Sequence, residues 1–240
     1  MQFGISLAHC HPEWQPLLNA ALKQMDSDYL NQLTQDASWL PGPEHVLASF
    51  SMPLSQTHYV LMGESPYPRA ASANGYAFWD GAVDSLWSPQ GLSKQVNRAT
   101  SLRNWIKMLL LARGDLQLDT SQHAITQVDK TNLVKTASEF FTGMMHKGIL
   151  LLNATLVYNE GNVPYHARHW KPFMHSLLSQ LAALKPDVQL ITFGKIADTL
   201  PKTSLKTGLV AEHPYNISFI INQSVINFFQ PLDLLANDSN

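Results

Sequence analysis

The amino-acid sequence predicts an α/β protein with three layers, α/β/α, around a central four-stranded parallel sheet. Short apolar runs rich in branched side chains have the length of buried strands, and helix-length segments lie between them. Strands that alternate with helices are typical of a parallel sheet covered on both faces. The chain has 240 residues, of which 45% are apolar, enough to build a substantial buried core.

Four runs are predicted as strands and three longer segments as helices. The runs are residues 58–63, 149–157, 188–194 and 207–213, and the helices are Leu92–Ala112, Lys130–His146 and Lys171–Leu184. The last helix ends before Pro186, because the residue before a proline disfavours the helical conformation. Right-handed crossovers between parallel strands place the functional loops at the carboxyl edge of the sheet. No repeat and no long linker interrupts the chain, so residues 1–240 are predicted to form a single domain, with no role assigned to residues 1–50.

Composition excludes several classes of protein. With 16 basic and 18 acidic residues, 14% of the chain is charged, against about 25% in typical soluble domains, so uncharged polar residues must cover much of the surface. The net charge of -2 excludes a globally basic protein that coats nucleic acid but allows a local basic patch. The single cysteine, Cys10, excludes an internal disulfide, an iron–sulfur cluster and a four-cysteine zinc site.

The sequence gives two indications of location. The N-terminal residues have no basic region before their short apolar stretch, which disfavours a secretory signal. The longest apolar segment, Gly148–Tyr158, is too short to span a membrane and contains Asn153 in its middle. We therefore expect a cytoplasmic protein that makes no membrane contact.

Residues 90–114 carry positive charges and no acidic side chain. The basic residues are Lys94, Arg98, Arg103, Lys107 and Arg113. Apolar residues at helical spacing in the same segment predict an amphipathic helix that packs through one face. Both properties hold together, because the polar face, including Arg98, can meet phosphates while the apolar face packs.

Unusual polar clusters follow three of the predicted strands. They are G-E-S-P-Y-P at residues 63–68, Asn153 within L-L-L-N-A-T-L, and E-H-P-Y-N-I-S at residues 212–218. Ligands bind at the carboxyl ends of the strands in open α/β sheets, so the three clusters are expected to converge. Taken singly, each also has a plain structural interpretation: a buried amide for Asn153, a capping residue for His213 and a turn for residues 63–68.

Two other kinds of chemistry are disfavoured. A serine nucleophile elbow at Ser65 would need the backbone N–H of the next residue for its oxyanion hole, and Pro66 has none. The adjacent residues His9, Cys10 and His11 invite a metal site, but side chains of neighbouring residues point apart. The histidine-containing stretch of residues 166–175 is interpreted as a helix entry with weak positive potential.

Taken together, the three clusters resemble the uracil-DNA glycosylase superfamily, closest to its family-1 branch. That branch carries, in chain order, a water-activating loop G-Q-D-P-Y-H, a phenylalanine about a dozen residues on, an asparagine in L-L-L-N-A and a closing H-P-S-P-L-S loop. The corresponding elements of this chain are G-E-S-P-Y-P, Phe78, Asn153 and H-P-Y-N-I-S, and the likeness runs from about Tyr59 to Phe229. The order of the motifs and their placement at strand ends make coincidence improbable.

The resemblance implies an enzyme that flips deoxyuridine out of DNA and cleaves its N-glycosidic bond. It implies that Asn153 reads uracil O4 and N3–H, that Phe78 stacks on the flipped base, and that Tyr67 excludes the C5 methyl group of thymine. His213 would hydrogen-bond uracil O2 and stabilise the departing base. Ile217 would fill the vacated stack.

The resemblance also implies how the protein meets DNA. Ser218 and, more loosely, Ser93 would hold flanking phosphates. The expected partner is DNA that contains uracil, and the expected enzyme is a monomer with no metal and no cofactor. Protein inhibitors and repair partners are not identified by the sequence.

The water-activating loop departs from the family pattern. Ser65 stands where the family has its water-positioning aspartate, and Glu64 replaces a glutamine and supplies a carboxylate one residue away. Pro68 replaces a histidine, and Tyr215-Asn216 replaces Ser-Pro in the last loop. Another branch of the superfamily has G-E-A-P-G at this place, but it carries a four-cysteine cluster. Two hypotheses follow: a glycosylase in which Glu64 or Ser65 contributes to catalysis, or a glycosylase-fold protein that binds DNA or a protein partner without cleaving.

Overall fold

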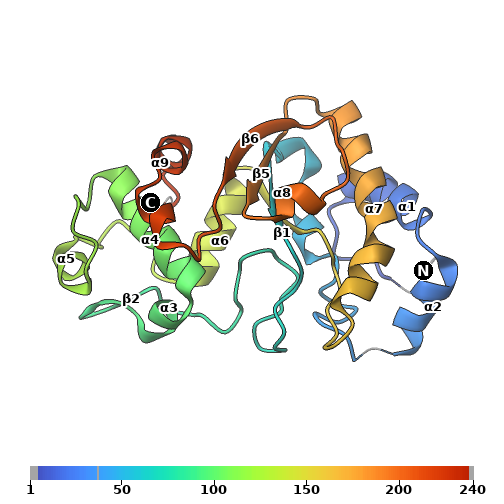
Figure 1. Cartoon of the computed structure of the whole chain (residues 1–240), viewed down its shortest axis with the longest axis horizontal. Coiled ribbons are helices and arrows are strands. Elements are labelled where there is room, and N and C mark those ends of the chain that lie inside the picture. Colours follow the sequence, from blue (N-terminus) through green and yellow to red (C-terminus); the bar gives the residue numbers. More distant parts are fainter. Residues whose placement is uncertain (1–4, 37, 238–240) are drawn as a thin grey trace. The chain divides into compact units, whose positions relative to one another are not determined.

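The structure is a computed structural model of the chain, and it describes residues 5–36 and 38–237 (Figure 1). Residues 1–4, 37 and 238–240 lie outside the described residues. Residues 1–4 and 37 belong to the segment of residues 1–50, to which the sequence assigned no role. The chain forms two compact units, each of which is described by itself. The first unit comprises residues 1–81 and 148–208, and the second comprises residues 82–147 and 209–240.

A four-stranded parallel sheet flanked by helices confirms the predicted α/β class. The strands are β1 (Tyr59–Gly63), β4 (Ile149–Asn153), β5 (Gln189–Phe193) and β6 (Lys206–Ala211), in the order β4-β1-β5-β6. All four lie within or close to the predicted runs. Every residue of β4 and all but the first of β1 are buried, which explains why these strands are continuous apolar runs rather than alternating ones.

The register between β1 and β4 positions the strand ends. Tyr59 pairs with Ile149 and Gly63 pairs with Asn153, so the two strands finish level with each other. Strand β1 also pairs with β5 on its other side, from Tyr59 to Met62. The polar residues that follow β1 and β4 therefore leave the sheet side by side.

The first unit contains the helices η1, α1, α2, η2, η3, α7 and α8. Their bounds are Pro12–Trp14, Gln15–Leu22, Ser27–Gln35, Ala48–Ser51, Leu54–Gln56, Val163–Leu184 and Ile196–Thr199. The N-terminal segment thus folds into this unit, and α1 packs along α7 (Figure 1). Helix α7 begins earlier than the predicted Lys171, with a proline in its first turn, where its missing N–H costs nothing. The stretch of residues 166–175 lies inside this helix rather than at its entry.

The second unit contains β2, β3, α3, α4, α5, α6, η4, α9 and η5. Their bounds are Trp87–Ser88, Gly91–Leu92, Lys94–Arg98, Thr100–Arg113, Gln122–Gln127, Ala137–His146, Ile217–Ile221, Gln223–Phe229 and Gln230–Leu232. Its core is aromatic: the Trp105 ring meets the rings of Phe140, Phe219 and Phe229 edge-on at centroid distances of 6.5, 6.3 and 5.6 Å. Such edge-to-face contacts add to the stability gained from burial.

Two predicted helices of this unit are wrong in extent. The predicted helix Leu92–Ala112 is two helices, because Ala99 leaves the helical region with φ -86° and ψ 80° between α3 and α4. The predicted helix Lys130–His146 begins only at Ala137, with a capping box formed by Thr136 and Glu139. The residues before Ala137 are held extended instead, since the N–H of Leu86 donates to the Lys135 carbonyl and the N–H of Ala137 donates to the Asp84 carbonyl.

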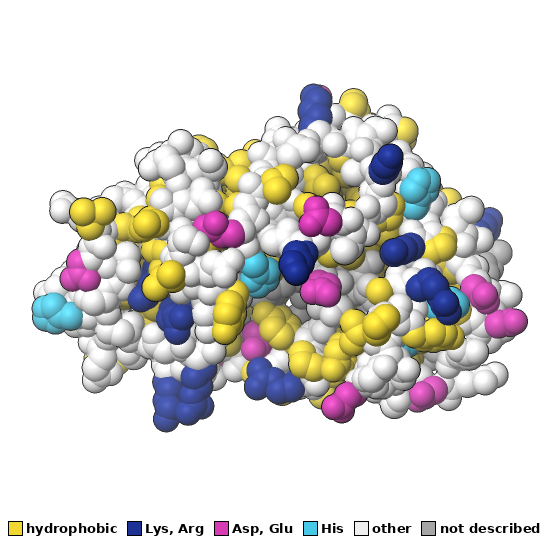
Figure 2. Space-filling view, viewed as in Figure 1, with side chains coloured by type: hydrophobic (Ala, Val, Ile, Leu, Met, Phe, Trp, Pro, Cys, Tyr) yellow, Lys and Arg dark blue, Asp and Glu magenta, His cyan; other side chains and the backbone are white. Residues whose placement is uncertain are grey.

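The surface has the predicted character. Figure 2 shows a face on which uncharged polar side chains and backbone predominate, with charged groups scattered between them. Among residues 5–36 and 38–237, no helix combines the length and the apolar character needed to cross a membrane.

Candidate functional site

Asn153, the last residue of β4, lies against Gly63, the last residue of β1. The side chain of Asn153 is 3% exposed. A Cβ atom added to Gly63 would lie 2.4 Å from Asn153 Oδ1 and 2.8 Å from Ala77 Cβ. Both distances are shorter than any tolerable contact, so glycine at this position is what allows the amide of Asn153 to lie across the end of β1.

Backbone hydrogen bonds hold the loop of residues 63–68 to the chain that follows Asn153. The carbonyl of Gly63 accepts from the N–H of Ala154 at 2.9 Å, and that of Glu64 accepts from Thr155 at 3.0 Å. The pairing of β1 with β4 therefore continues past the strands. As a result, the position of Glu64 is fixed by the sheet.

Tyr67 and Phe78 are joined by a hydrogen bond. The hydroxyl of Tyr67 donates to the carbonyl of Phe78 at 3.2 Å. Burial, with a smaller contribution from the Asp80 carboxylate, raises the pKa of Tyr67 to about 12, so the phenol stays protonated at neutral pH and remains a donor. The bond fixes the Tyr67 ring relative to the Phe78 backbone.

Phe78 has a left-handed backbone conformation with φ 64°. Non-glycine residues adopt this region rarely, and such strain persists only where the surroundings enforce it. Here the N–H of Ala77 donates to Leu151 of β4 at 3.1 Å, and the Phe78 ring meets the Phe193 ring edge-on at 5.8 Å. In the first unit, Phe78 is thus hydrogen-bonded to Tyr67, and its neighbour Ala77 is hydrogen-bonded to the strand that ends at Asn153.

The side chain of Glu64 lines a cleft of about 310 Å³ in the first unit. Thr155 and the basic residues Arg168 and Lys171 of α7 line the same cleft. Glu64 is exposed, whereas the next residue, Ser65, is half-buried. Glu64 therefore shares this cleft with two basic residues of α7.

His213 belongs to the second unit, and a local hydrogen bond sets its ring. The backbone N–H of Tyr215 donates to His213 Nδ1 at 3.1 Å. A ring nitrogen that accepts a hydrogen bond carries no proton, so the N–H of this imidazole is on Nε2. The predicted convergence of His213 with the residues of the first unit stays a prediction.

Asn104 of α4 holds the loop that follows His213. It is 2% exposed, and its amide nitrogen lies 2.8, 3.3 and 3.4 Å from the carbonyl oxygens of Pro214, Tyr215 and Asn216. Two amide hydrogens are thus shared among three consecutive carbonyls. Sequence reasoning missed this residue, although an amide between the apolar residues at positions 102 and 105 on a buried helix face was a usable signal.

The residues predicted to contact DNA differ in exposure. Ile217 is 80% exposed, at the start of η4, and Ser218 is exposed beside it. Ser93 is only 7% exposed, and its hydroxyl accepts from the N–H of Val96 at 3.1 Å as the N-cap of α3. The Ser93 hydroxyl is therefore already engaged by the helix that it caps.

Only part of the basic segment is open to solvent. Lys94 and Arg98 are exposed on α3, and Figure 2 shows basic side chains gathered at the lower edge of the region that α3 occupies. Arg103 instead donates to the carbonyl of Asn97 at 3.0 Å, and burial lowers the pKa of Lys107. The exposed positive charge thus lies on α3 rather than along the whole segment.

The side chains of residues 9–11 point to three different partners. His9 Nε2 lies 3.4 Å from a Glu44 carboxylate oxygen, Cys10 Sγ lies 3.9 Å from the carbonyl of Leu47, and His11 Nδ1 accepts from a backbone N–H as the cap of η1. Burial raises the pKa of the Cys10 thiol to about 11, so the thiol stays protonated. In the described part of the chain, no three His, Cys, Asp or Glu side chains are grouped to hold a metal ion.

Comparisons with known proteins point to one family. No family model matches the chain. A curated "Uracil-DNA glycosylase" from Leuconostoc citreum is 28% identical over 217 residues, which cover 87% of this chain and 84% of the relative. The wild-type "UNG" crystal structure from Nitratifractor salsuginis is 41% identical with a TM-score of 0.92, covering 98% of this chain and 96% of that one. A mimivirus uracil-DNA glycosylase, 19% identical with a TM-score of 0.55 over 89% of this chain and 72% of that one, shares the fold.

The contact between Gly63 and Asn153 predicts the effect of a single methyl group. Gly63→Ala should destabilise the protein by about 1 to 3 kcal/mol, the usual cost of overpacking a full site. The matched control is Gly143→Ala in α6, where a Cβ meets nothing within 4 Å, and which should be neutral or stabilise by about 0.5 to 1 kcal/mol. Urea unfolding measures both, and equal stability of the two variants would contradict the close contact.

The hydrogen bonds of Asn104 predict how the loop responds to their loss. Asn104→Leu leaves the loop carbonyls without their donor, so amide hydrogen exchange at Tyr215 to Ile217 should accelerate, and the free energy of unfolding should fall by about 1 to 3 kcal/mol. The control is Asn97→Leu in α3, which removes the hydrogen bond from the Asn97 side-chain amide to the carbonyl of Leu92 in β3. The control should lose stability without faster exchange in the loop. The same exchange rates in both variants would show that Asn104 does not order the loop.

Proposed function

Since this chain belongs to the uracil-DNA glycosylase superfamily, we propose that it removes uracil from DNA in base-excision repair by hydrolysing the N-glycosidic bond of a flipped deoxyuridine. The observation that carries the proposal is the buried amide of Asn153, whose Oδ1 lies against Gly63, where Ala77 also approaches. A buried amide at the carboxyl end of a parallel strand is costly unless it is paired, and it is well suited to reading the edge of a base.

Asn153 accounts for selection of uracil over cytosine. Its amide offers one donor and one acceptor, which complement uracil O4 and N3–H. Cytosine presents an amino donor and an unprotonated ring nitrogen at the same places, so both contacts would be reversed. Gly63 leaves the room that the amide occupies, because a Cβ there would lie 2.4 Å from Asn153 Oδ1.

Phe78 and Tyr67 account for binding of the flipped base and for exclusion of thymine. The Phe78 ring supplies a stacking surface. Tyr67 occupies the space that the C5 methyl group of thymine requires. Because the Tyr67 hydroxyl is bonded to the Phe78 carbonyl, the two rings are held as a unit, and Tyr67 does not swing aside to admit the methyl group.

His213 acts on the leaving base. When the bond between C1′ of the sugar and N1 of uracil breaks, the electron pair goes to uracil. A water oxygen then adds to C1′, and the proton that this water loses balances the negative charge on the released base. The Nε2–H of His213 donates to uracil O2, where the negative charge develops, and preorganised donors of this kind supply much of the rate enhancement of enzymes. The N–H of Tyr215 keeps His213 Nδ1 an acceptor, so the ring proton is on Nε2.

A carboxylate is needed to oppose the positive charge that develops on the sugar and to orient the attacking water. Glu64 is the acidic residue of the loop, and the sheet fixes its backbone. Ser65 is neutral and a poor base, so its role is limited to a hydrogen bond to the water. Glu64 therefore supplies the negative charge, directly or through a bridging water.

DNA contacts surround this chemistry. Ile217 protrudes from the start of η4 with 80% of its surface exposed and fills the space that the flipped nucleotide leaves. The exposed residues Ser218 and Arg98 hold the flanking phosphates. The predicted phosphate contact of Ser93 is disfavoured, because this residue is buried and caps α3. Catalysis in this scheme uses protein side chains alone, and a monomeric state and a cytoplasmic location stay predictions.

The direct test is an assay on an oligonucleotide that contains a single uracil. Alkali cleaves the abasic product, so strand scission reports release of the base. Scission that depends on both the protein and uracil supports the proposal. DNA binding without scission would instead favour the second hypothesis, a glycosylase-fold protein that binds without cleaving.

Asn153→Asp tests the base-reading role. A carboxylate accepts from the cytosine amino group and repels uracil O4, so the preference for uracil over cytosine should fall or invert by about 1 to 3 kcal/mol. Turnover on matched uracil and cytosine oligonucleotides measures this preference. An unchanged preference would show that Asn153 is only a structural amide.

Glu64→Gln and Ser65→Asp test the source of the negative charge. Glu64→Gln should lower turnover by about 10² to 10⁴ while DNA affinity stays nearly constant. Ser65→Asp, which restores the family residue, should raise turnover. If the wild-type protein releases no uracil, Glu64→Gln changes nothing and Ser65→Asp creates activity, the protein is a binder that lost its chemistry at this position.

A further inference from the structure

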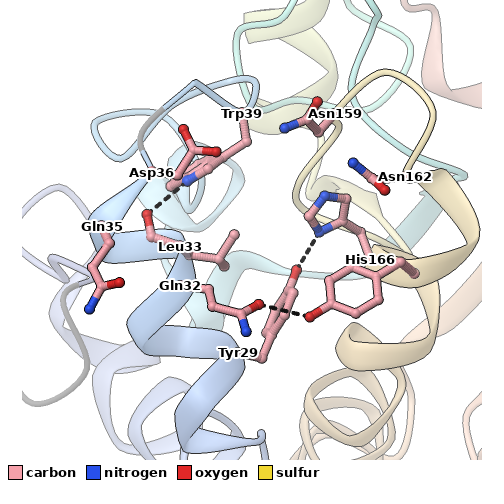
Figure 3. A pocket seen from close by; sticks show the side chains of 10 residues that line it. Tyr29, Gln32, Leu33, Gln35, Asp36, Trp39, Asn159, Asn162 and His166 are labelled. Carbon is pink, nitrogen blue, oxygen red and sulfur yellow. Dashed lines mark hydrogen bonds between the residues drawn. The ribbon is translucent and has the colours of Figure 1, made fainter.

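A second cleft in the first unit lies between α2 and the first turns of α7 (Figure 3). Its volume is about 440 Å³, within the range of small-molecule sites. It is lined by residues of the N-terminal segment and of the chain between β4 and α7. None of the residues in the proposed uracil pocket lines it, so a ligand here would be separate from the reacting base.

The floor of this cleft is apolar and rigid. Tyr29, Leu33 and Trp39 are 1%, 6% and 4% exposed. The indole N–H of Trp39 donates to the Leu33 carbonyl at 2.9 Å (Figure 3), and the Tyr29 ring stacks on the His169 ring with centroids 4.4 Å apart. These contacts hold flat aromatic groups in place beneath the cleft, an arrangement suited to a planar ligand.

His166 presents a buried donor at the cleft. The residue is 6% exposed, and its Nδ1 lies 2.8 Å from the Tyr29 hydroxyl (Figure 3). Burial raises the pKa of Tyr29 well above its usual value, so this phenol stays protonated, and we assign it as the donor to Nδ1. Burial also lowers the pKa of His166, which favours a neutral ring, and with Tyr29 as the donor the ring proton is on Nε2.

The Nε2–H of His166 has no hydrogen-bond partner among the described residues. A buried donor left without an acceptor costs about 1 to 3 kcal/mol. A carbonyl oxygen of a ligand in the cleft would remove this cost. The donor therefore favours a ligand with a carbonyl group.

Amide side chains also line the cleft between α2 and α7. Gln35, Asn159 and Asn162 line the cleft, and Asn162 makes no side-chain cap hydrogen bond although it precedes the first residue of α7. Each amide offers a donor and an acceptor. The one charged side chain of the described lining is Asp36, with no lysine or arginine, so a phosphate would find no positive side chain there.

We propose that this cleft binds an uncharged nucleobase or nucleoside. The planar ring lies on the aromatic floor, a ring carbonyl accepts from His166 Nε2, and the remaining donors and acceptors of the base pair with the amides. A nucleobase combines these features: it is flat, it is uncharged, and its edge carries carbonyl and N–H groups. The site does not depend on cleavage of the N-glycosidic bond.

The test follows the imidazole nitrogens of His166 by NMR in the full chain. Uracil, deoxyuridine and deoxyuridine monophosphate are titrated separately into protein labelled with ¹⁵N-histidine. Uracil and deoxyuridine should shift the Nε2 signal with an apparent Kd of about 1 mM or tighter. The monophosphate should bind about tenfold more weakly, because its charge meets Asp36 and no cation. The same shift in Asn153→Asp would show that it arises at this cleft rather than in the uracil pocket.

Asn162→Ala supplies a matched comparison. It removes one exposed amide from the cleft and should weaken uracil binding about 3- to 10-fold. The control is Asn31→Ala, an exposed amide of α2 outside the described lining, which should leave binding unchanged. Uracil release from DNA, measured in parallel, should be the same in both variants, so failure of this proposal is distinguishable from failure of the proposed function.

Three results would overturn the proposal. One is the absence of any shift at His166 with about 10 mM uracil or deoxyuridine, well above the expected Kd. Another is a shift with ribose but not with uracil, which would indicate a carbohydrate site. The third is equal weakening by Asn162→Ala and Asn31→Ala, which would place the ligand elsewhere.

Discussion

The contact between Gly63 and Asn153 is the constraint on which the first unit's site depends. Parallel pairing ends β1 and β4 at the same level, and the missing side chain of Gly63 leaves room for the Asn153 amide. The same glycine lets Ala77 approach, and Ala77 in turn fixes the strained backbone of Phe78. The position of the Asn153 amide and the backbone conformation of Phe78 therefore both depend on one close approach at the end of β1.

Backbone groups do much of the positioning. The carbonyl of Phe78 holds Tyr67, the N–H of Tyr215 sets the tautomer of His213, and the amide of Asn104 gathers the carbonyls that follow it. Backbone atoms are fixed by the fold, so side chains tied to them lose little freedom when substrate arrives. Asn104 also orders a loop in which Asn216 stands where the family has a rigid proline, so a tertiary hydrogen bond replaces a covalent restraint.

In the loop of residues 63–68, the carboxylate of Glu64 lies one residue before the position at which the family has its aspartate. Neighbouring side chains on an extended segment face opposite ways, and here Glu64 faces a cleft lined by Arg168 and Lys171 while Ser65 is half-buried. The backbone of Glu64 is tied to Thr155 in the chain beyond Asn153.

The sequence by itself determined the four strands, because buried parallel strands must be continuous apolar runs, and it determined which polar residues follow β1 and β4. It did not determine the helix break at Ala99. Nor did it determine the late start of α6, where long-range backbone hydrogen bonds to residues 84 and 86 override local propensity. The role of Asn104 and the cleft at His166 were decided only by tertiary structure. Each depends on residues more than a hundred positions apart in the chain, and no local pattern encodes such a meeting.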